Sequence, residues 1–284
     1  TLATLFGAFY CIFHKPQHIF HVHEIMDRPK IARFFFKTLL RFFSDRVVYN
    51  SEATKDFYNG IAPSLQKKSV VILNGVDRND EEISASEINQ IREQLFKAED
   101  SNFLIGLVGR INRLKGHSLL LSAFELVSEK FPNTKLCFVG STPPEQEFYL
   151  ANLQSEVNSS KVADKVCFVD FQKNVFSILE SLDLVIVPST EPESFGLIVV
   201  EAMLAKKAVI GSNLGGISTI IEADETGLLF EPNNTDELAA AISQMIENTD
   251  VKEKIEAKAY QKAIAKYSTN TMYQRFNEFY KTVL

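Results

Sequence analysis

The chain has 284 residues, 45% of them hydrophobic, and carries 30 basic against 36 acidic residues, for a formal net charge of −6. This apolar content is enough to bury two cores and argues against disorder, and the acidic balance argues against a broad nucleic-acid interface. The apolar runs are much shorter than a bilayer-spanning segment and residues 6–13 lack a cleavage pattern, so we expect neither a membrane anchor nor a signal peptide.

Three short apolar runs near the start of the chain, residues 19–23, 46–49 and 69–73, are predicted to be strands. The first of them contains the sequence FHVHEI. Because side chains alternate along a strand, His21 and His23 are expected on the same face, where two imidazoles could bind a metal. The sequence offers no further His or Cys cluster, so histidines satisfied within a core are the more ordinary interpretation.

Residues 28–46, RPKIARFFFKTLLRFFSDR, interleave basic and aromatic side chains on a predicted helix. Such a helix can lie on a membrane, with its cations near anionic lipid and its apolar face at the headgroup boundary. It can also pack its Phe side chains on a sheet and leave the basic residues outside. We favour the packed helix and keep peripheral membrane contact through 28–46 as the alternative.

A polar stretch between Asp77 and Ser101 contains the predicted boundary between two domains, with a helix expected over 87–97. After it, short apolar runs alternate with helical stretches, which is typical of a parallel sheet with helices between its strands. The predicted fold class is therefore α/β, with two Rossmann-like parallel-sheet domains. The five runs are 103–108, 135–139, 166–169, 183–187 and 207–210.

Three cysteines, Cys11, Cys137 and Cys167, form no CxxC pair. Cys137 and Cys167 lie inside predicted strands, so we expect reduced core residues rather than a disulfide, which is consistent with the cytoplasm.

The loop after the run 103–108 reads GRINRLKGH over residues 109–117. Gly109 lets the chain turn away from the strand, and Arg110 and Lys115 follow it. Arg offers a planar fork of donors and Lys a compact charge, a pair that suits the oxygens of a diphosphate. Loops at the carboxyl ends of parallel strands are where open α/β sheets bind ligands, although a basic loop is more often simply solvated.

The loop after the run 183–187 leads into ESFGLIVVE over residues 193–201. A helix is expected to start near Phe195 or Gly196, where free amides and the helix dipole favour phosphate. Glu193 then lies just before the helix and Glu201 about a turn inside it, so the two carboxylates could hold sugar hydroxyls at one end and ribose at the other. A solvated loop Glu and an ordinary helix Glu are the plain alternative.

Together these segments resemble the nucleotide-binding domain of retaining glycosyltransferases of family 4, the group 1 transferases with the two-domain GT-B architecture. The resemblance covers GRINRLKGH, the sequence KLCFVG at residues 135–140, and residues 188–230. It implies a GT-B-like fold with a partial acceptor-side domain over 1–85, a nucleotide-sugar-binding domain over 86–266, and a C-terminal helix over 267–284 that packs back toward the first domain. It also implies that about a hundred residues of an ordinary first domain are absent upstream.

The resemblance further implies the roles of individual residues. Arg110 and Lys115 would neutralise the donor diphosphate, Glu193 would meet hydroxyls of the transferred sugar, and Glu201 would bind ribose. His23 would hydrogen-bond the donor sugar, and a turn at Gly215 and Gly216 would lie near it. The implied catalytic residues are His23, Arg110, Lys115 and Glu193, and the implied donor-binding residues are Gly109, Arg110, Lys115, Glu193, Ser194, Phe195, Gly196, Leu197 and Glu201.

We therefore expect a retaining transfer of a sugar from a nucleoside-diphosphate sugar to a hydroxyl of a glycan or lipid-linked saccharide, without a metal or other cofactor. By resemblance the setting is polysaccharide or glycolipid assembly, in the cytoplasm or peripheral at the inner face of the cell membrane. The alternatives are a nucleotide-sugar epimerase or a glycan phosphorylase on the same scaffold, and a noncatalytic nucleotide-sugar-binding subunit. A phosphorylase would need a lysine that binds pyridoxal phosphate, and no motif in the sequence indicates one.

Overall fold

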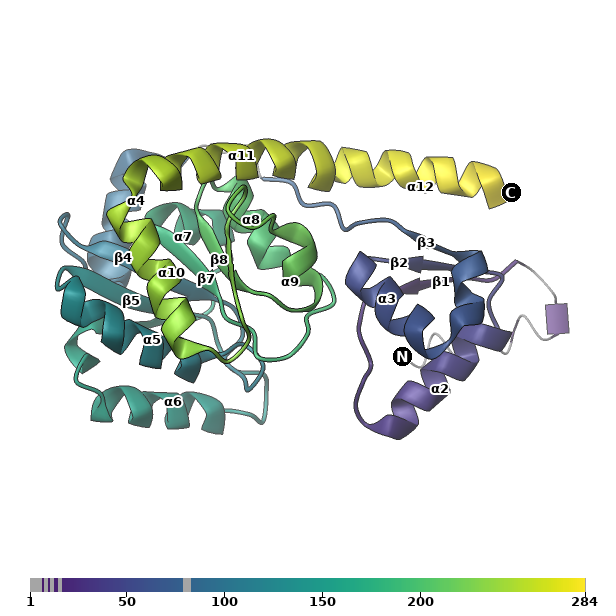
Figure 1. The fold of residues 1–284 in the computed structure, drawn as a ribbon, viewed down its shortest axis with the longest axis horizontal. Coiled ribbons are helices and arrows are strands. Elements are labelled where there is room, and N and C mark those ends of the chain that lie inside the picture. The colour runs from purple at the N-terminus through teal and green to yellow at the C-terminus, as the bar shows by residue number, and fades with distance from the viewer. Residues whose placement is uncertain (1–6, 8–9, 11–12, 15–16, 79–82, 284) are drawn as a thin grey trace.

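The computed structural model describes residues 7, 10, 13–14, 17–78 and 83–283 and contains two parallel sheets (Figure 1). The larger sheet has the strand order β6-β5-β4-β7-β8-β9, and the smaller has the order β1-β2-β3. Every strand pair in both sheets is parallel. The predicted α/β class with Rossmann-like sheets is confirmed.

The larger sheet contains all five of the strands that we predicted after residue 100, and a sixth, β9, that we did not. The predicted run 207–210 is shifted, because the turn that ends α8 continues through Lys206, at a φ of 56°, and the strand begins only at Val209. The strands are β4 (Phe103–Val108), β5 (Thr134–Val139), β6 (Val166–Val169), β7 (Leu184–Val187), β8 (Val209–Ser212) and β9 (Leu228–Phe230).

Helices cover both faces of this sheet (Figure 1). Alternation along β7 explains this, because Val185 and Val187 contribute to one core while Leu184 and Ile186 contribute to the other. The first core is closed by α7 (Val175–Ser181), α8 (Leu197–Leu204) and α11 (Thr249–Tyr267), and the second by α5 (His117–Lys130), α6 (Phe148–Ser159) and α10 (Thr235–Glu247). The remaining helices of this part are α4 (Ala85–Gln90), a π-helical turn (Ile91–Leu95), a 3-10 turn (Ala163–Lys165) and α9 (Gly215–Ile220).

The strand order places a topological switch point between β4 and β7. From β4 the chain proceeds to β5 and β6 on one side, and it then returns to place β7, β8 and β9 on the other. Ligands of open α/β sheets bind outside the carboxyl ends of the strands at such a point. The two loops singled out in the sequence follow β4 and β7, so both leave the sheet at this position.

The smaller sheet consists of β1 (Ile19–Val22), β2 (Arg46–Tyr49) and β3 (Ser69–Val71), with α2 (Lys30–Phe42), α3 (Glu52–Ile61) and a 3-10 turn (Pro63–Lys68). Its core is formed around Phe20, Tyr49, Tyr58 and Leu65. The first strand is shorter than predicted and ends at Val22, so His23 lies just beyond it. The rings of His21 and His23 still lie on the same side, with centroids 6.5 Å apart, as the alternation predicted.

The helix α2 divides its apolar residues between core and solvent. Leu39 and Leu40 are buried and Phe36 packs against the core, whereas Phe34 and Phe42 are 68% and 66% exposed. The prediction of a Phe face packed on a sheet is therefore wrong for part of the helix, because only one side of α2 contacts the small core.

Across residues 17–78 and 83–283, no helix combines the length and the apolar composition that crossing a bilayer requires.

The two sheets are joined by two chain segments that lie side by side. Val76, after β3, donates its amide to the carbonyl of Tyr267 at the end of α11 (N···O 2.7 Å), and Asp77 accepts from the amide of Thr269 (3.0 Å). Thr269 begins α12 (Thr269–Val283), which extends α11 toward the smaller sheet (Figure 1).

Aromatic contacts fix α12 against the first strand. The His21 ring stacks on Phe276 with centroids 5.2 Å apart, and Tyr280 Oη lies 3.3 Å from His21 Nε2. The domain boundaries stay a prediction.

Cys137 and Cys167 are opposite each other in the register of β5 and β6 and are free thiols, as predicted. Burial raises the pKa of Cys137, as expected for a core thiol. Cys11 and most of the apolar run 6–13 lie outside the described residues.

Candidate active site

The loops after β4 and β7 are hydrogen-bonded to each other. The Thr190 amide donates to the Leu114 carbonyl over 2.9 Å, and its hydroxyl lies 3.2 Å from the Arg113 carbonyl. Arg113 also forms an ion pair with Glu191. The two segments that the sequence analysis selected independently therefore form one surface at the switch point.

Gly116 allows this contact. It has a φ of 72°, a left-handed conformation that favours glycine, and it caps the amino end of α5. A Cβ atom at this position would lie 1.9 Å from the carbonyl oxygen of Pro188, the first residue after β7. The close approach of the two loops depends on the absence of a side chain here.

Lys115 and Glu193 form an ion pair between the two loops. Lys115 Nζ lies 2.7 Å from Glu193 Oε1, and the Ser189 hydroxyl donates to the same oxygen. The side chains of the pair are 23% and 19% exposed, so their attraction is screened less than that of a surface pair. A fixed cation and a fixed carboxylate thus stand together at the edge of the sheet.

The helix α8 starts beside this pair, as predicted. Gly196 is its N-cap, with a φ of 100°, and no side chain accepts a hydrogen bond from the first amides. These amides are free to bind an anion, and the positive end of the helix dipole lies at the same place. Leu197 is exposed at the start of the helix, and Glu201 is half-buried within it. Burial raises the pKa of the Glu201 carboxyl.

The backbone of Glu193 is held from the opposite side by α9. Its carbonyl accepts the Gly216 amide over 2.7 Å, and a Cβ at Gly215 would lie 2.7 Å from the same oxygen. The turn predicted at Gly215 and Gly216 leads into α9: Leu214 is extended, and Gly215 has a left-handed φ of 59° at the start of the helix. The pair of glycines therefore lets a helix end approach the loop.

Arg110 and Gly109 lie at the start of the first loop. The Gly109 amide donates to the Val139 carbonyl of β5, and the Lys115 side chain passes 3.8 Å from where a Gly109 Cβ would stand. The Arg110 side chain is exposed, and no residue in the described part of the chain forms an ion pair or hydrogen bond with it. The structure thus brings Lys115 to Glu193 and leaves the Arg110 guanidinium in solvent.

His23 is exposed and follows β1 in the smaller sheet. Its carbonyl accepts a hydrogen bond from Asn50 Nδ2 over 3.2 Å. The ring of His21 lies 6.5 Å from that of His23, and burial and then this neighbour lower the pKa of His21. Within residues 17–78 and 83–283, no three His, Cys, Asp or Glu side chains gather as a metal site would require.

His117, the last residue of the GRINRLKGH sequence, lies in the core at the start of α5. It is 4% exposed, its ring is 5.3 Å from that of Phe138, and neither ring nitrogen has a hydrogen-bond partner in the structure. Burial and then the nearby charge of Lys115 lower its pKa from 6.5 to about 4. The imidazole is therefore neutral in the folded protein at neutral pH.

This shift predicts a pH-dependent loss of stability. Because the folded-state pKa is depressed, the unfolded chain binds a proton first, and the stability present above pH 6.5 is lost as the pH falls toward 4. For these pKa values the loss between pH 7 and pH 5 is about 2 kcal/mol. In His117→Leu this contribution is absent. The free energy of unfolding, measured with urea at pH 7, 6 and 5, should therefore fall more steeply for the natural chain than for the variant. The same pH dependence in both proteins would contradict a lowered pKa at His117.

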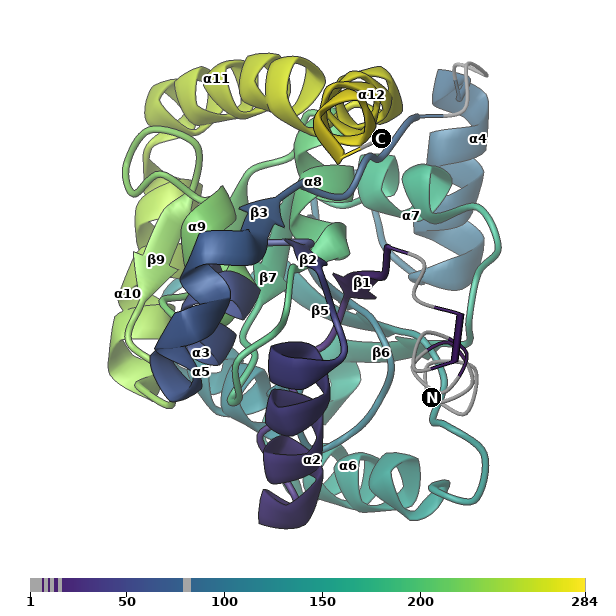
Figure 2. The same cartoon turned by 90° about the vertical axis from the view of Figure 1, so that its right-hand side faces the viewer.

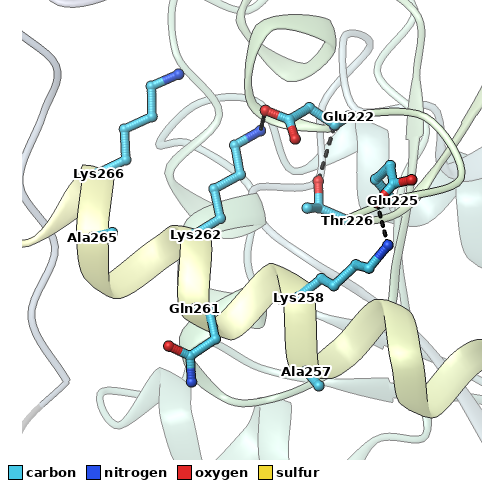
Figure 3. A pocket seen from close by; sticks show the side chains of 9 residues that line it. All are labelled: Glu222, Glu225, Thr226, Ala257, Lys258, Gln261, Lys262, Ala265 and Lys266. Atoms are coloured by element: carbon cyan, nitrogen blue, oxygen red, sulfur yellow. Dashed lines mark hydrogen bonds and ion pairs between the residues drawn. The ribbon is translucent and has the colours of Figure 1, made fainter.

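A shallow groove lies away from these loops, between α11 and the segment that follows α9 (Figure 3). Lys262 and Lys258 cross it to pair with Glu222 and Glu225. The groove is lined by none of the residues predicted to bind a donor, and two of its three lysines are paired with its glutamates. Its lining is Glu222, Glu225, Thr226, Ala257, Lys258, Gln261, Lys262, Ala265 and Lys266.

Some polar residues that contact the loop of Glu193 were not predicted from the sequence. Ser189 binds the carboxylate, and Ser51 and Thr54 contact the carbonyl of Ser194. Ser189 could have been found from its place directly after a predicted strand. Ser51 and Thr54 carry only the signal of a helix N-cap, which says nothing about a contact more than a hundred residues away.

Residues 87–262 match the family described as "Glycosyl transferases group 1". A curated relative, the lipopolysaccharide 1,2-N-acetylglucosaminetransferase of Salmonella typhimurium, is 32% identical over 241 residues, which are 82% of this chain and 61% of that protein. The capsular polysaccharide biosynthesis glycosyltransferase CapM of Staphylococcus aureus is 28% identical over 69% of this chain and 50% of its own length. The chain thus spans about three fifths or less of these relatives.

A solved structure of similar fold is that of Anabaena HepE in complex with UDP-glucose. It superposes with a TM-score of 0.91 at 26% identity, covering 99% of this chain and 76% of that one. The same protein in complex with UDP gives a TM-score of 0.91 at 27% identity.

Proposed function

The chain belongs to the group 1 glycosyl transferases, and from this we propose that it transfers a sugar from a nucleoside-diphosphate sugar to a hydroxyl group of a saccharide or lipid-linked acceptor. The observation that carries the proposal is the Lys115–Glu193 pair beside the uncapped start of α8. A cation and free amides suit a diphosphate, and a carboxylate suits sugar hydroxyls. All three stand at the switch point of the sheet, where ligands of such folds bind.

In this proposal the chain stabilises the leaving nucleoside diphosphate. Negative charge gathers on the diphosphate as the bond to the sugar breaks, and groups already fixed where that charge develops lower the barrier. Lys115 and the amides of Phe195, Gly196 and Leu197 would meet the charge, and the solvent-exposed Arg110 would swing onto it when the donor binds. Glu201, half-buried in α8, would bind the ribose, and His23 would approach the sugar from the smaller sheet.

The comparisons support UDP-glucose or a related UDP-sugar as the first donor to test, since HepE was crystallised with UDP-glucose. Relatives named for lipopolysaccharide and capsular polysaccharide synthesis favour a role in surface glycans. Assignment to the retaining family 4 rests on the GRINRLKGH and ESFGLIVVE segments. Retention, independence from metal ions and a cytoplasmic site of action belong to this proposal.

The experiment that tests the function separates binding from transfer. We expect UDP and UDP-glucose to raise the melting temperature, because a ligand of the native state stabilises it. We expect UDP release to accelerate when saccharide acceptors are supplied, to persist in EDTA, and to yield a product with the anomeric configuration of the donor by NMR. Epimer interconversion without an acceptor would favour the epimerase, and binding without release would favour a noncatalytic subunit.

The exposed side of α2 supports a second part of the proposal, contact with an anionic membrane. Ile31, Phe34 and Phe42 project into solvent, and the helix carries Lys and Arg without any acidic residue. Such a helix suits a surface that offers both apolar depth and negative charge. A membrane-bound transferase would stand next to a lipid-linked acceptor.

Replacing Phe34 and Phe42 by Ser should release the protein from vesicles. Burying one Phe is worth about 1.5–3 kcal/mol, so the double variant should bind vesicles of phosphatidylcholine and phosphatidylglycerol at least about tenfold less tightly in co-sedimentation. The matched control is Phe148→Ser, another exposed Phe on α6 in the other part of the molecule. Equal binding of both variants, or no binding by the natural chain, would refute the membrane contact.

A further inference from the structure

The smaller α/β unit contacts the loop of Glu193 through two buried hydroxyl groups. Ser51 is the N-cap of α3, and Thr54 follows one turn later. The Ser51 hydroxyl donates to the carbonyl oxygen of Ser194, and Thr54 Oγ1 lies 3.2 Å from the same oxygen. Both side chains are completely buried. This contact joins α3 to Ser194, which follows Glu193 directly and precedes the start of α8.

Hydrogen bonds also connect these hydroxyl groups, through Asn50, to the segment of His23. Thr54 Oγ1 lies 3.0 Å from Asn50 Oδ1, and Asn50 Nδ2 donates to the His23 carbonyl over 3.2 Å. Each hydroxyl has one proton, so Thr54 can donate to Asn50 while Ser51 donates to Ser194, or Ser51 can donate to Thr54 while Thr54 donates to Ser194. In both arrangements the Ser194 carbonyl accepts a hydrogen bond from the smaller unit.

The loop of Glu193 is thereby held on two sides. Helix α9 supplies the Gly216 amide to the Glu193 carbonyl, and α3 supplies hydroxyls to the next carbonyl along. Helices α3 and α9 also pack against each other, as Figure 2 shows from the side of the smaller sheet. Two consecutive carbonyls with fixed donors leave the backbone of this loop little freedom to rotate, which fixes the direction of the Glu193 side chain.

We propose that Ser51 and Thr54 are positioning residues that lock the loop of Glu193 against the segment of His23, and so set the sugar-binding carboxylate for transfer. The proposal rests on the proposed function for its catalytic part. The diphosphate contacts, Lys115 and the start of α8, belong to the larger sheet and do not pass through α3. Losing the lock should therefore slow the reaction while leaving the nucleotide bound.

The test uses Thr54→Val in the full chain, which keeps the shape of the side chain and removes its hydroxyl, together with Ser51→Ala. The matched control is Thr134→Val, because Thr134 is also buried and its hydroxyl donates to the Phe131 carbonyl before β5, at the end of the sheet away from the site. The readouts are hydrogen exchange of the Gly216 amide, which donates to the Glu193 carbonyl, UDP affinity by titration calorimetry, and consumption of UDP-glucose.

We expect the Gly216 amide to exchange about tenfold faster in Thr54→Val/Ser51→Ala and at the natural rate in Thr134→Val. UDP affinity should stay within about twofold, whereas kcat for UDP-glucose should fall about tenfold or more at an unchanged KM. The single variant Thr54→Ser keeps a hydroxyl group, so its exchange protection and kcat should stay close to those of the natural chain.

Unchanged exchange of the Gly216 amide in the double variant would overturn the proposal, and so would equal acceleration in Thr134→Val. A fall in UDP affinity that accounts for the whole loss of activity would also overturn it, since the hydroxyls would then act on binding. If the natural chain neither binds UDP nor consumes UDP-glucose while exchange still responds to Thr54→Val, the proposed function fails and the locking contact is supported.

Discussion

Replacing Lys115 by Met should reduce the consumption of a UDP-sugar by roughly 10²–10³, the cost of removing one fixed group that stabilises charge in a transition state. Among the described residues, Lys115 is the one that forms an ion pair with Glu193, with Nζ 2.7 Å from Oε1. Met keeps the length of the side chain, so the packing beside Gly109 is preserved. Steady-state kinetics and UDP titration check the prediction, and both kcat and UDP affinity should fall.

The control for this change is Lys130→Met at the other end of α5. Lys130 pairs with Glu247 on α10 and is 58% exposed, so its loss should alter stability and activity very little. A second comparison is Lys115→Met combined with Glu193→Gln. If the two residues act as one unit, the double variant should be no worse than the worse single variant. A Lys115→Met enzyme with natural kinetics would remove Lys115 from the site.

Gly116→Ala should unfold the protein more easily by at least about 3 kcal/mol, because an Ala at a φ of 72° is strained and its methyl group overlaps the Pro188 carbonyl. The neighbour is backbone at the end of a buried strand, which cannot rotate away as a side chain can. The loops after β4 and β7 would have to separate, so activity should be lost as well. Urea unfolding and the UDP-sugar assay measure the two effects.

The matched control is Gly60→Ala in α3. A Cβ at Gly60 would meet no atom within 4 Å, and Gly60 lies inside a helix, where Ala is more stable than Gly by about 0.5–1 kcal/mol. The same substitution is thus expected to destabilise at one position and to stabilise at the other. If both variants lose stability equally, the close approach at Pro188 is not the cause.

The larger sheet was predictable because its signals are local. Each strand is a short apolar run such as FLIGLV, and each loop carries its own glycine and charge, so residues 109–117 and 193–201 could be placed at carboxyl ends without knowing their neighbours. That the two loops meet follows from the rule that parallel strands present these ends at one edge. The ion pair between Lys115 and Glu193 was not predicted, because the sequence assigned the two side chains to different parts of a donor.

What escaped prediction depends on contacts distant in sequence. Nothing near Ser51 indicates a bond to Ser194, 143 residues away, and nothing in KGH indicates that His117 turns inward to Phe138. The exposure of Phe34 on α2 was missed because periodicity reveals an apolar face but not what covers it. Burial of a polar ring and exposure of an apolar one are decided by packing, which a single sequence does not encode locally.

The chain crosses between the two sheets near Val76 and again near Tyr267, and these two crossings lie side by side. The chain passes between the two sheets at only these places in the described residues, and hydrogen bonds tie one crossing to the other, as do contacts of Thr269 with Gly75 and Asp77. A rotation about this edge that parts α3 from α9 would also remove the hydroxyl groups of Ser51 and Thr54 from the Ser194 carbonyl. That carbonyl would then accept hydrogen bonds from water.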